Sequence, residues 1–151
     1  MTEVNGSNAM QIPHADTVEL RMDARPENLV LARLALAGVA ARTRLPEDVV
    51  ADLKLAVTEA CTNAIEHAYA GDPDDNEILV RFELGDDALS VDVQDWGVGF
   101  DEESVPPPTA ELRDHAGVGL MLIRSLTDEL TIESGGTGSI VSFAKRFSPP
   151  A

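Results

Sequence analysis

The segment from residue 46 to about residue 70 restricts the fold more than any other part of the chain, because its hydrophobic pattern has the period of a long helix. Apolar residues recur three and four apart on one stripe, at Val49, Leu53, Ala56, Val57, Ala60, Ala64 and Ala68. Pro46 suits the start of a helix, and Gly71 stands where a C-terminal cap belongs. Four polar side chains crowd one edge of the stripe: Glu59, Asn63, Glu66 and His67. A helix that only covers a core does not need them, so we expect this helix to carry part of a functional site.

Around this helix, stretches of period-two alternation are interspersed with two further helical segments. Strands are predicted near residues 17–22, 78–84, 89–93, 130–133 and 139–147, and helices over residues 26–42 and 120–128. Because strands follow one another without strict β-α-β alternation, this order favours an α+β fold. The expected form is a two-layer sandwich in which a mostly antiparallel, mixed sheet carries helices on one face. A doubly wound nucleotide-binding fold is disfavoured, because the chain has no GxxxxGK[ST] motif and no GxGxxG motif after a strand.

The length of the chain limits the number of domains that it can form. It has 151 residues, of which 44% are hydrophobic, and this is enough to bury one core but leaves little room for two. We expect a flexible N-terminal tail over residues 1–16, one domain over residues 17–147 and a short C-terminal tail over residues 148–151. Within the domain, residues 95–117 contain three consecutive prolines and no periodic apolar face. Residues 101–116 are therefore predicted to be a mobile lid.

The chain is strongly acidic, with a formal net charge of −16. Such a charge is repelled by phosphate backbones and anionic lipids, so direct binding to nucleic acid or to a membrane is disfavoured. The acidity fits a solvated surface; alternatively, it steers a basic protein partner or helps to hold Mg²⁺. The single cysteine, Cys61, excludes an internal disulfide and is expected in the core. The N-terminus lacks signal-peptide character, and no run approaches the roughly 20 apolar residues of a membrane span, so we expect a cytoplasmic location.

Glu59 and Asn63 form the first candidate pair for chemistry. They are four residues apart, so their side chains lie about one turn apart on the same face of the predicted helix. An amide oxygen is a hard ligand of the kind that Mg²⁺ accepts, and a glutamate one turn away can take a proton from an attacking hydroxyl. On its own, the pair is more typical of a solvated helix edge.

Two glycine-containing motifs follow. Asp95-Trp96-Gly97-Val98-Gly99-Phe100 comes directly after a predicted strand, where the carboxylate can accept a hydrogen bond from an amino group while the backbone passes close to a flat ligand. Gly117-Val118-Gly119-Leu120 stands at the start of a predicted helix, where backbone N–H groups and the positive end of the helix can approach phosphates. Either motif alone also fits an ordinary turn or a helix cap.

Taken in order, these segments carry a family resemblance. TEACTNAIEHAY, DWGVGF, the proline-containing loop and GVGLMLI resemble the N box, G1 box, ATP lid and G2 box of the GHKL (histidine-kinase-like) ATPase superfamily. The string E-A-x-T-N-A-I-x-H-x-Y is most similar to RsbW-type anti-sigma-factor serine/threonine protein kinases. The resemblance spans about residues 17 to 147. It implies an ATP- and Mg²⁺-dependent kinase that sequesters a sigma factor and phosphorylates a STAS-domain anti-anti-sigma factor, and it implies a homodimer.

The resemblance also implies a role for each matching residue. Glu59 would be the catalytic base and Asn63 the Mg²⁺ ligand, while Asp95 would recognise the adenine amino group. The remaining nucleotide-binding residues would be Gly97, Gly99, Gly117, Val118, Gly119, Leu120 and Ser139. Ser139 would direct its hydroxyl toward the adenine pocket. His67 is expected to pack or cap, and Trp96 to be a partly buried rim residue.

Two alternatives to a serine kinase stay open, and one departure from the family bears on the first of them. Related kinases carry a basic residue just before the G2 glycines, whereas here Arg113 is two positions further out and His115 is nearer. The first alternative is therefore a non-catalytic module whose partner binding is gated by nucleotide. The second is a detached histidine kinase ATPase domain, which is disfavoured because no phosphoacceptor hairpin precedes the domain.

Overall fold

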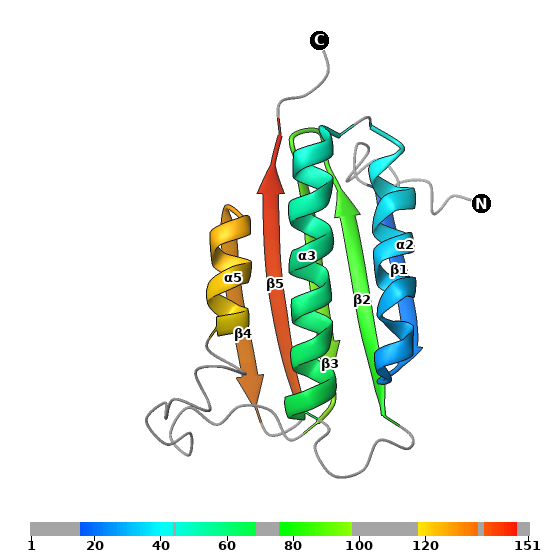
Figure 1. Ribbon diagram of the computed structural model, residues 1–151, viewed down its shortest axis with the longest axis vertical. Helices are drawn as coiled ribbons and strands as arrows, with labels where there is room; N and C mark the ends of the chain where they lie inside the picture. Colours follow the sequence, from blue (N-terminus) through cyan, green and yellow to red (C-terminus); the bar gives the residue numbers. More distant parts are fainter. Residues whose placement is uncertain (1–15, 44, 69–75, 98–117, 136–137, 148–151) are drawn as a thin grey trace, which may run out of the picture.

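The computed structural model describes residues 16–43, 45–68, 76–97, 118–135 and 138–147 (Figure 1). Its five strands form one sheet in the order β1-β2-β3-β5-β4. The strands are β1 (Asp16–Asp23), β2 (Glu77–Leu84), β3 (Ala88–Asp95), β4 (Glu129–Gly135) and β5 (Gly138–Arg146). Every pair of neighbouring strands is antiparallel. The described sheet is therefore wholly antiparallel, whereas the sequence pattern is also compatible with a mixed one.

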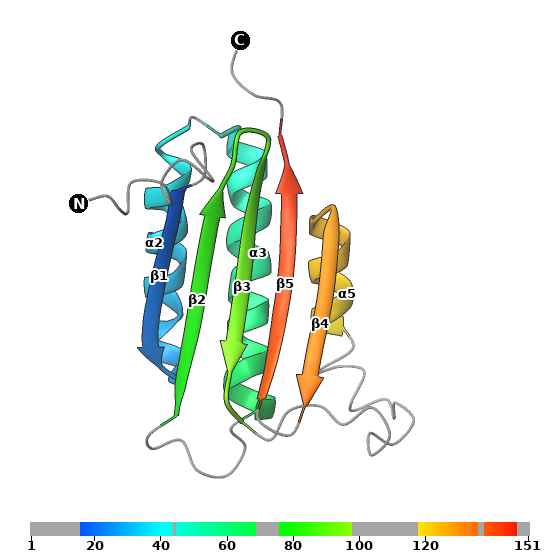
Figure 2. The ribbon, with the colours of Figure 1, turned by 180° about the vertical axis from the view of Figure 1, so that it is seen from behind.

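The helices all cover one face of this sheet. They are α2 (Leu29–Ala40), α3 (Glu47–Asn63) and α5 (Val118–Leu126), with a short 3-10 turn at Pro26–Asn28 and a π-helical turn, η2, at Ala64–Ala68. Figure 1 shows the helices in front of the sheet, and Figure 2 shows that the described part of the chain places no helix behind it. The predicted α+β two-layer sandwich is confirmed.

The core fills the space between the two layers. Along β2 and β3 every second residue is buried, and the inward set is Ile78, Val80, Phe82, Leu84, Leu89, Val91 and Val93. Leu53, Ala56 and Val57 of α3 pack against it with no exposed surface. Cys61 is also fully buried, as the sequence predicts, and burial raises the pKa of its thiol to about 12. The apolar stripe of the long helix is therefore the central element of the core.

Two boundaries differ from those predicted, and both concern site residues. The long helix is α-helical only to Asn63 and continues as a π turn to Ala68, so the regular stripe does not extend along the whole predicted segment. Strand β3 continues through Asp95, which is its last residue rather than the first residue of a loop. The hairpin between β2 and β3 closes as expected, with the Gly85 N–H donating to the Ala88 carbonyl at 2.9 Å.

Several predictions concern residues outside the described part of the chain. These are the tails at 1–15 and 148–151, the proposed cap at Gly71, Gly99 and Gly117, and the lid with Arg113 and His115. The side chains of His67 and Val118 are also outside it. None of the helices in the described segments has the length and apolar character needed to span a bilayer.

Candidate active site

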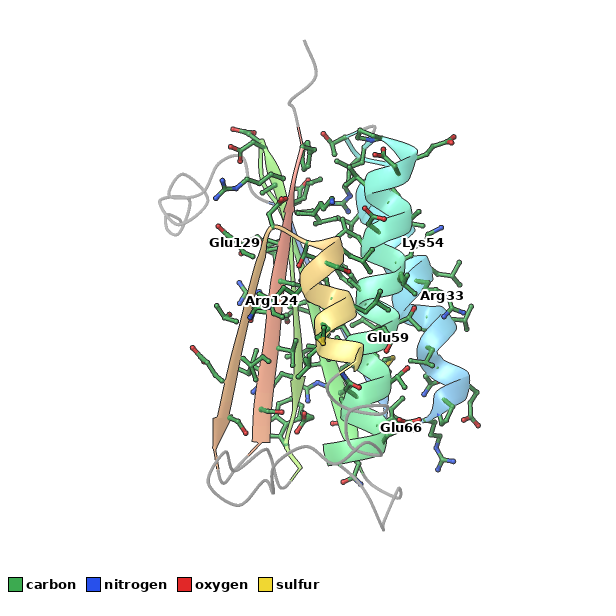
Figure 3. All side chains as sticks on the ribbon, turned by 60° about the vertical axis from the view of Figure 1, so that its left-hand side comes forward. Arg33, Lys54, Glu59, Glu66, Arg124 and Glu129 are labelled. Atoms are coloured by element: carbon green, nitrogen blue, oxygen red, sulfur yellow. The ribbon has the colours of Figure 1, made fainter. Side chains whose placement is uncertain are left out.

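The C-terminal end of α3 and the first turn of α5 bring three predicted site residues together. A Cβ atom placed on Gly119 would lie 3.1 Å from Glu59 Oε2, and 3.1 and 3.2 Å from the two side-chain heteroatoms of Asn63. Figure 3 shows Glu59 on α3 beside the start of α5. Gly119 thus lets the backbone of α5 approach these two polar side chains, and any larger residue would fill the space between the helices.

Asn63 is the unusual member of this group. Only 7% of it is exposed, yet its side-chain amide forms no hydrogen bond within the described part of the chain. Buried amides are almost always hydrogen-bonded, because an unpaired one costs about 1–3 kcal/mol of desolvation. The helical pattern predicts Asn63 on a polar edge of the helix, but the side chain is buried and faces Gly119. No group among the described residues donates to this buried amide oxygen, and an oxygen of this kind beside a carboxylate fits the hard-ligand environment that Mg²⁺ accepts.

A second group lies where β3 and β5 pair. Asp95 is buried, and each of its carboxylate oxygens accepts one hydrogen bond, from the Gly97 N–H at 3.0 Å and from the Ser139 hydroxyl at 2.7 Å. Asp95 and Ser139 are direct partners in the antiparallel register, so the ladder itself sets their contact. The carboxylate is therefore held in one orientation, with remaining acceptor capacity on both oxygens.

Gly138 makes this arrangement possible. Its φ of +132° lies in the region that side-chain-bearing residues rarely adopt. A Cβ atom at this position would overlap the Asp95 carbonyl oxygen and lie 2.8 Å from the Trp96 Cα. The start of β5 therefore packs backbone to backbone against the end of β3, which delivers the hydroxyl of Ser139 to Asp95. The sequence showed Gly138 only as part of a matching Gly-Ser pair.

The ends of β3, β4 and β5 also enclose an open hollow of about 230 Å³. Asp95, Trp96, Glu133 and Ser139 are among the residues that line it. Trp96 is 45% exposed, in keeping with the predicted rim position, and the Arg21 guanidinium lies 5.5 Å from its ring centroid. Sequence reasoning missed this cation–π pair, because only the β1–β2–β3 register brings the two residues close.

The two groups lie at the same end of the molecule. The C-terminal end of α3 and the end of β3 both lie at the bottom of Figure 1, and β3 contacts η2, the turn that follows Asn63. Leu120 is half-buried against the core, and Val118 begins α5. Among the described residues, the predicted site thus comprises two groups, which we name after the roles predicted for them: the phosphate-side group (Glu59, Asn63, Gly119) and the base-side group (Asp95, Gly97, Ser139).

Comparison with known proteins assigns the chain to a class. Residues 22–145, most of its length, match the family described as the histidine kinase-like ATPase domain. A histidine kinase domain from Erythrobacter litoralis shares this fold, with a TM-score of 0.54 at 24% identity over 80% of this chain and 59% of that chain. ATP is the nucleotide of this class of domain.

Individual relatives narrow the class. The serine-protein kinase RsbW of Bacillus licheniformis is 38% identical over 142 residues, covering 87% of this chain and 88% of the relative. RsbW of Bacillus subtilis is 38% identical over 129 residues, covering 80% of each. A crystal structure of the RsbU and RsbW domains of a Mycobacterium tuberculosis protein superposes with a TM-score of 0.68 at 25% identity, over 90% of this chain. This chain spans about a third (33%) of that longer molecule. The chain therefore belongs to the histidine kinase-like ATPases and, within them, to the RsbW-type serine-protein kinases.

Proposed function

We propose that this chain is an ATP-dependent protein serine kinase that also acts as an anti-sigma factor. The observation that carries the proposal is the buried amide of Asn63 beside Glu59, which has no hydrogen-bond partner among the described residues, with Gly119 leaving space over both side chains. A ligand group and a base at this spacing suit phosphoryl transfer, in which the protein mainly positions reactants and stabilises charge.

The phosphate-side group would hold the triphosphate. Asn63 would bind Mg²⁺ through its amide oxygen, and the first turn of α5, from Val118 to Leu120, would present backbone N–H groups to the phosphates. When bound, Mg²⁺ would neutralise negative charge on the transferring phosphoryl group. Two further glycines lie outside the described residues: Gly117 would approach the phosphates, and Gly99 would help to shape the adenine wall. At the base-side group, Asp95 would accept a hydrogen bond from the adenine amino group, while Gly97 and Ser139 fix the carboxylate orientation.

The proposed transfer exchanges one phosphorus–oxygen bond for another. The oxygen of an acceptor serine forms a bond to the γ-phosphorus, the bond from that phosphorus to the bridging oxygen breaks, and ADP leaves. Glu59 accepts the proton of the serine hydroxyl. Glu59 suits this task because it is only partly buried, so an acceptor can reach it. Asn63, whose amide has no partner within the described segments, would serve as the ligand.

The partners follow from the RsbW-type family. We propose that the domain, residues 17–147, sequesters a sigma factor and phosphorylates a STAS-domain anti-anti-sigma factor, acting as a cytoplasmic homodimer. The net charge of −16 supports capture of a basic sigma-factor surface and disfavours direct contact with nucleic acid or membrane.

The test is Glu59→Gln, which keeps the size of the side chain but removes its basicity. Radiolabel transfer from ATP to a recombinant STAS-domain protein of the same organism should fall by about 10²–10⁴-fold, the usual scale for a general base. ATP affinity should stay within a few-fold. Glu66→Gln is the matched control, because Glu66 is exposed on the next turns beyond Glu59 (Figure 3) and should leave transfer unchanged.

Three outcomes decide between the functions. Equal transfer by parent and Glu59→Gln would remove Glu59 from the mechanism. No transfer by the parent, together with tight ATP binding and nucleotide-dependent sigma-factor binding, would favour the non-catalytic gate. Transfer to a histidine of a separate phosphoacceptor domain, and not to serine, would favour the detached histidine kinase domain.

A further inference from the structure

The outer surface of α2 is apolar, although this helix lies at the rim of the helix layer. Val30, Leu31 and Leu34 are 44%, 41% and 62% exposed. Their spacings of three and four residues place them on one face, which we call the α2 outer face. Leu36 and Val39 already bury the opposite side of α2 in the core. Helices that are apolar all round are normally covered all round, so this surface indicates a contact that one folded chain does not supply.

No element of the described chain covers the α2 outer face. α2 packs against α3, β1 and β2, and β1 is the edge strand of the sheet. Figures 1 and 2 show α2 at this same edge, with no described helix or strand beyond it. A partner can therefore approach α2 without displacing any described element.

Charge indicates which occupant fits the α2 outer face. Residues 28–43 include no acidic residue, although the chain has 27 Asp and Glu and a net charge of −16. Two copies can therefore meet here without placing carboxylates against one another. The one charged side chain of α2, Arg33, extends sideways to α3, with its Nη1 3.4 Å from the Thr58 Oγ1. Lys54 and Arg124 belong to α3 and α5, so neither adds charge to this face.

Two other occupants fit this face less well. A basic partner surface, such as that proposed for the sigma factor, would meet no carboxylate on it. Helices that bind a membrane surface carry Lys and Arg along a polar face, which α2 lacks, and anionic lipid repels a chain of this charge. A second copy is the occupant that both the apolar surface and the charge favour.

The charged residues beyond the two ends of α2 favour one arrangement of the copies. Glu27 stands two residues before the helix and Arg42 two residues after it, and both are exposed. Antiparallel α2 helices would bring each Glu27 level with the partner's Arg42, whereas parallel helices would bring like charges together. Arg42 also lies 3.4 Å from Asp16, but this pair is half-exposed and leaves the guanidinium accessible to a second carboxylate. Arg25 precedes the 3-10 turn in extended conformation, outside the helical surface.

We propose that two copies of this chain pair through the α2 outer face with their α2 helices antiparallel. Leu34, beside the midpoint of α2, would lie nearest the two-fold axis and contact its own counterpart. Each Glu27 would pair with Arg42 of the partner subunit. This inference rests on the homodimer of the proposed function and assigns the surface that forms it.

The first test removes the apolar contact. Leu34→Gln is compared with Leu55→Gln, a control at a 43% exposed leucine of α3. Because two-fold symmetry makes each substitution act twice, Leu34→Gln should raise the dimer dissociation constant by about 30–1,000-fold, and Leu55→Gln should leave it unchanged. The patch is smaller than the roughly 800 Å² per partner of a standard interface, so sedimentation equilibrium from about 1 to 200 µM suits the dimer expected. Circular dichroism should show both variants to be folded.

The second test exchanges the charges. Glu27→Arg or Arg42→Glu alone turns two attractive pairs into two repulsive ones and should raise the dissociation constant by about ten-fold or more. The double variant should restore the parental value, because the pairs re-form with their signs reversed. Single variants that dimerise like the parent would exclude the antiparallel arrangement.

The outcomes separate this inference from the function on which it rests. A parental dimer that Leu34→Gln leaves intact would overturn the α2 interface and leave the homodimer in place. A parent protein that stays monomeric at about 200 µM would refute both. Loss of sigma-factor binding by Leu34→Gln without any change in the dimer would assign the α2 outer face to the sigma factor instead, and parental binding to anionic vesicles would assign it to a membrane.

Discussion

At the scale of single residues, the site depends on polar side chains that the fold buries. Asn63 and Asp95 illustrate two different cases. Both carboxylate oxygens of Asp95 accept hydrogen bonds within the protein, whereas the amide of Asn63 has none in the described chain. The hydrogen bonds of the folded domain therefore stabilise the buried Asp95 carboxylate, whereas burial of the Asn63 amide lowers the free energy of unfolding. This difference predicts different responses to substitution.

For Asn63→Ala we expect opposite effects on stability and on binding. Removing an unsatisfied buried amide should leave the free energy of unfolding unchanged or raise it by about 1–2 kcal/mol, because the desolvation cost disappears. Mg²⁺-dependent ATP affinity should fall at least ten-fold, since the proposed ligand oxygen is lost. Urea unfolding without nucleotide and calorimetry with Mg²⁺ or EDTA would measure the two effects. A marked loss of stability without nucleotide would show instead that Asn63 is a structural residue.

Asp95→Asn should preserve the fold and lose base selectivity. The amide oxygen can still accept from the Gly97 N–H, and the Ser139 hydroxyl can turn to accept from the amide nitrogen. The free acceptor capacity for an adenine amino group falls, so the preference for ATP over GTP should fall at least ten-fold. Competition binding with both nucleotides measures this preference. Asp92→Asn, two residues earlier on the same strand, is the control, and an equal preference in both variants would exclude Asp95 as the adenine reader.

At the scale of elements, the pairing of β5 with β3 depends on Gly138. Its positive φ and its contact with the Asp95 backbone leave no room for a side chain. Gly138→Ala should therefore destabilise the domain by about 1–3 kcal/mol and weaken ATP binding, because Ser139 shifts away from Asp95. Gly38→Ala is the control: Gly38 lies inside α2, where a Cβ meets nothing within 4 Å, and the change should stabilise by about 0.5–1 kcal/mol. Denaturant unfolding of both variants checks the opposite signs.

The elements themselves were largely predictable from sequence. Alternation identified all five strands, and helical periodicity identified the three main helices, because local patterns report which face is buried. The end of α3 was not predictable, since nothing in AIEHA distinguishes a π turn from an α turn. The burial of Asn63 was also missed: it depends on the approach of α5, which only tertiary packing determines. For the same reason, the sequence identified Glu59 and Gly119 as candidates but not their contact.

At the scale of the whole molecule, the titration of Cys61 should appear in the pH dependence of stability. Burial raises the pKa of its thiol to about 12, from 9.0 for the ordinary group. Above pH 9 the unfolded chain loses this proton and the folded chain retains it. The contribution of the Cys61 thiol to the free energy of unfolding is therefore fully present below pH 9. It is lost as the pH rises toward 12, by about 1.4 kcal/mol per pH unit.

Urea unfolding from pH 8 to pH 11 measures this loss. Cys61→Ala should be less stable than the parent at pH 8, because it leaves a small cavity, but its stability should decline less steeply above pH 9. Parallel slopes for parent and variant would assign the alkaline loss to other groups. Slow reaction of the parent with thiol reagents at pH 8 is expected on the same grounds.

The position of β5 also bears on how the protein is made. This strand is the last element of the described chain, yet it lies inside the sheet, between β3 and β4, and carries Ser139 to Asp95. During synthesis the ribosome releases Glu59, Asn63 and Asp95 well before this strand. The emerging chain therefore holds most of the residues proposed to bind nucleotide, but lacks the contact between Ser139 and Asp95 that orients the carboxylate. ATP binding should begin abruptly once β5 has left the exit tunnel, so that an unfinished chain does not compete with finished molecules for partners.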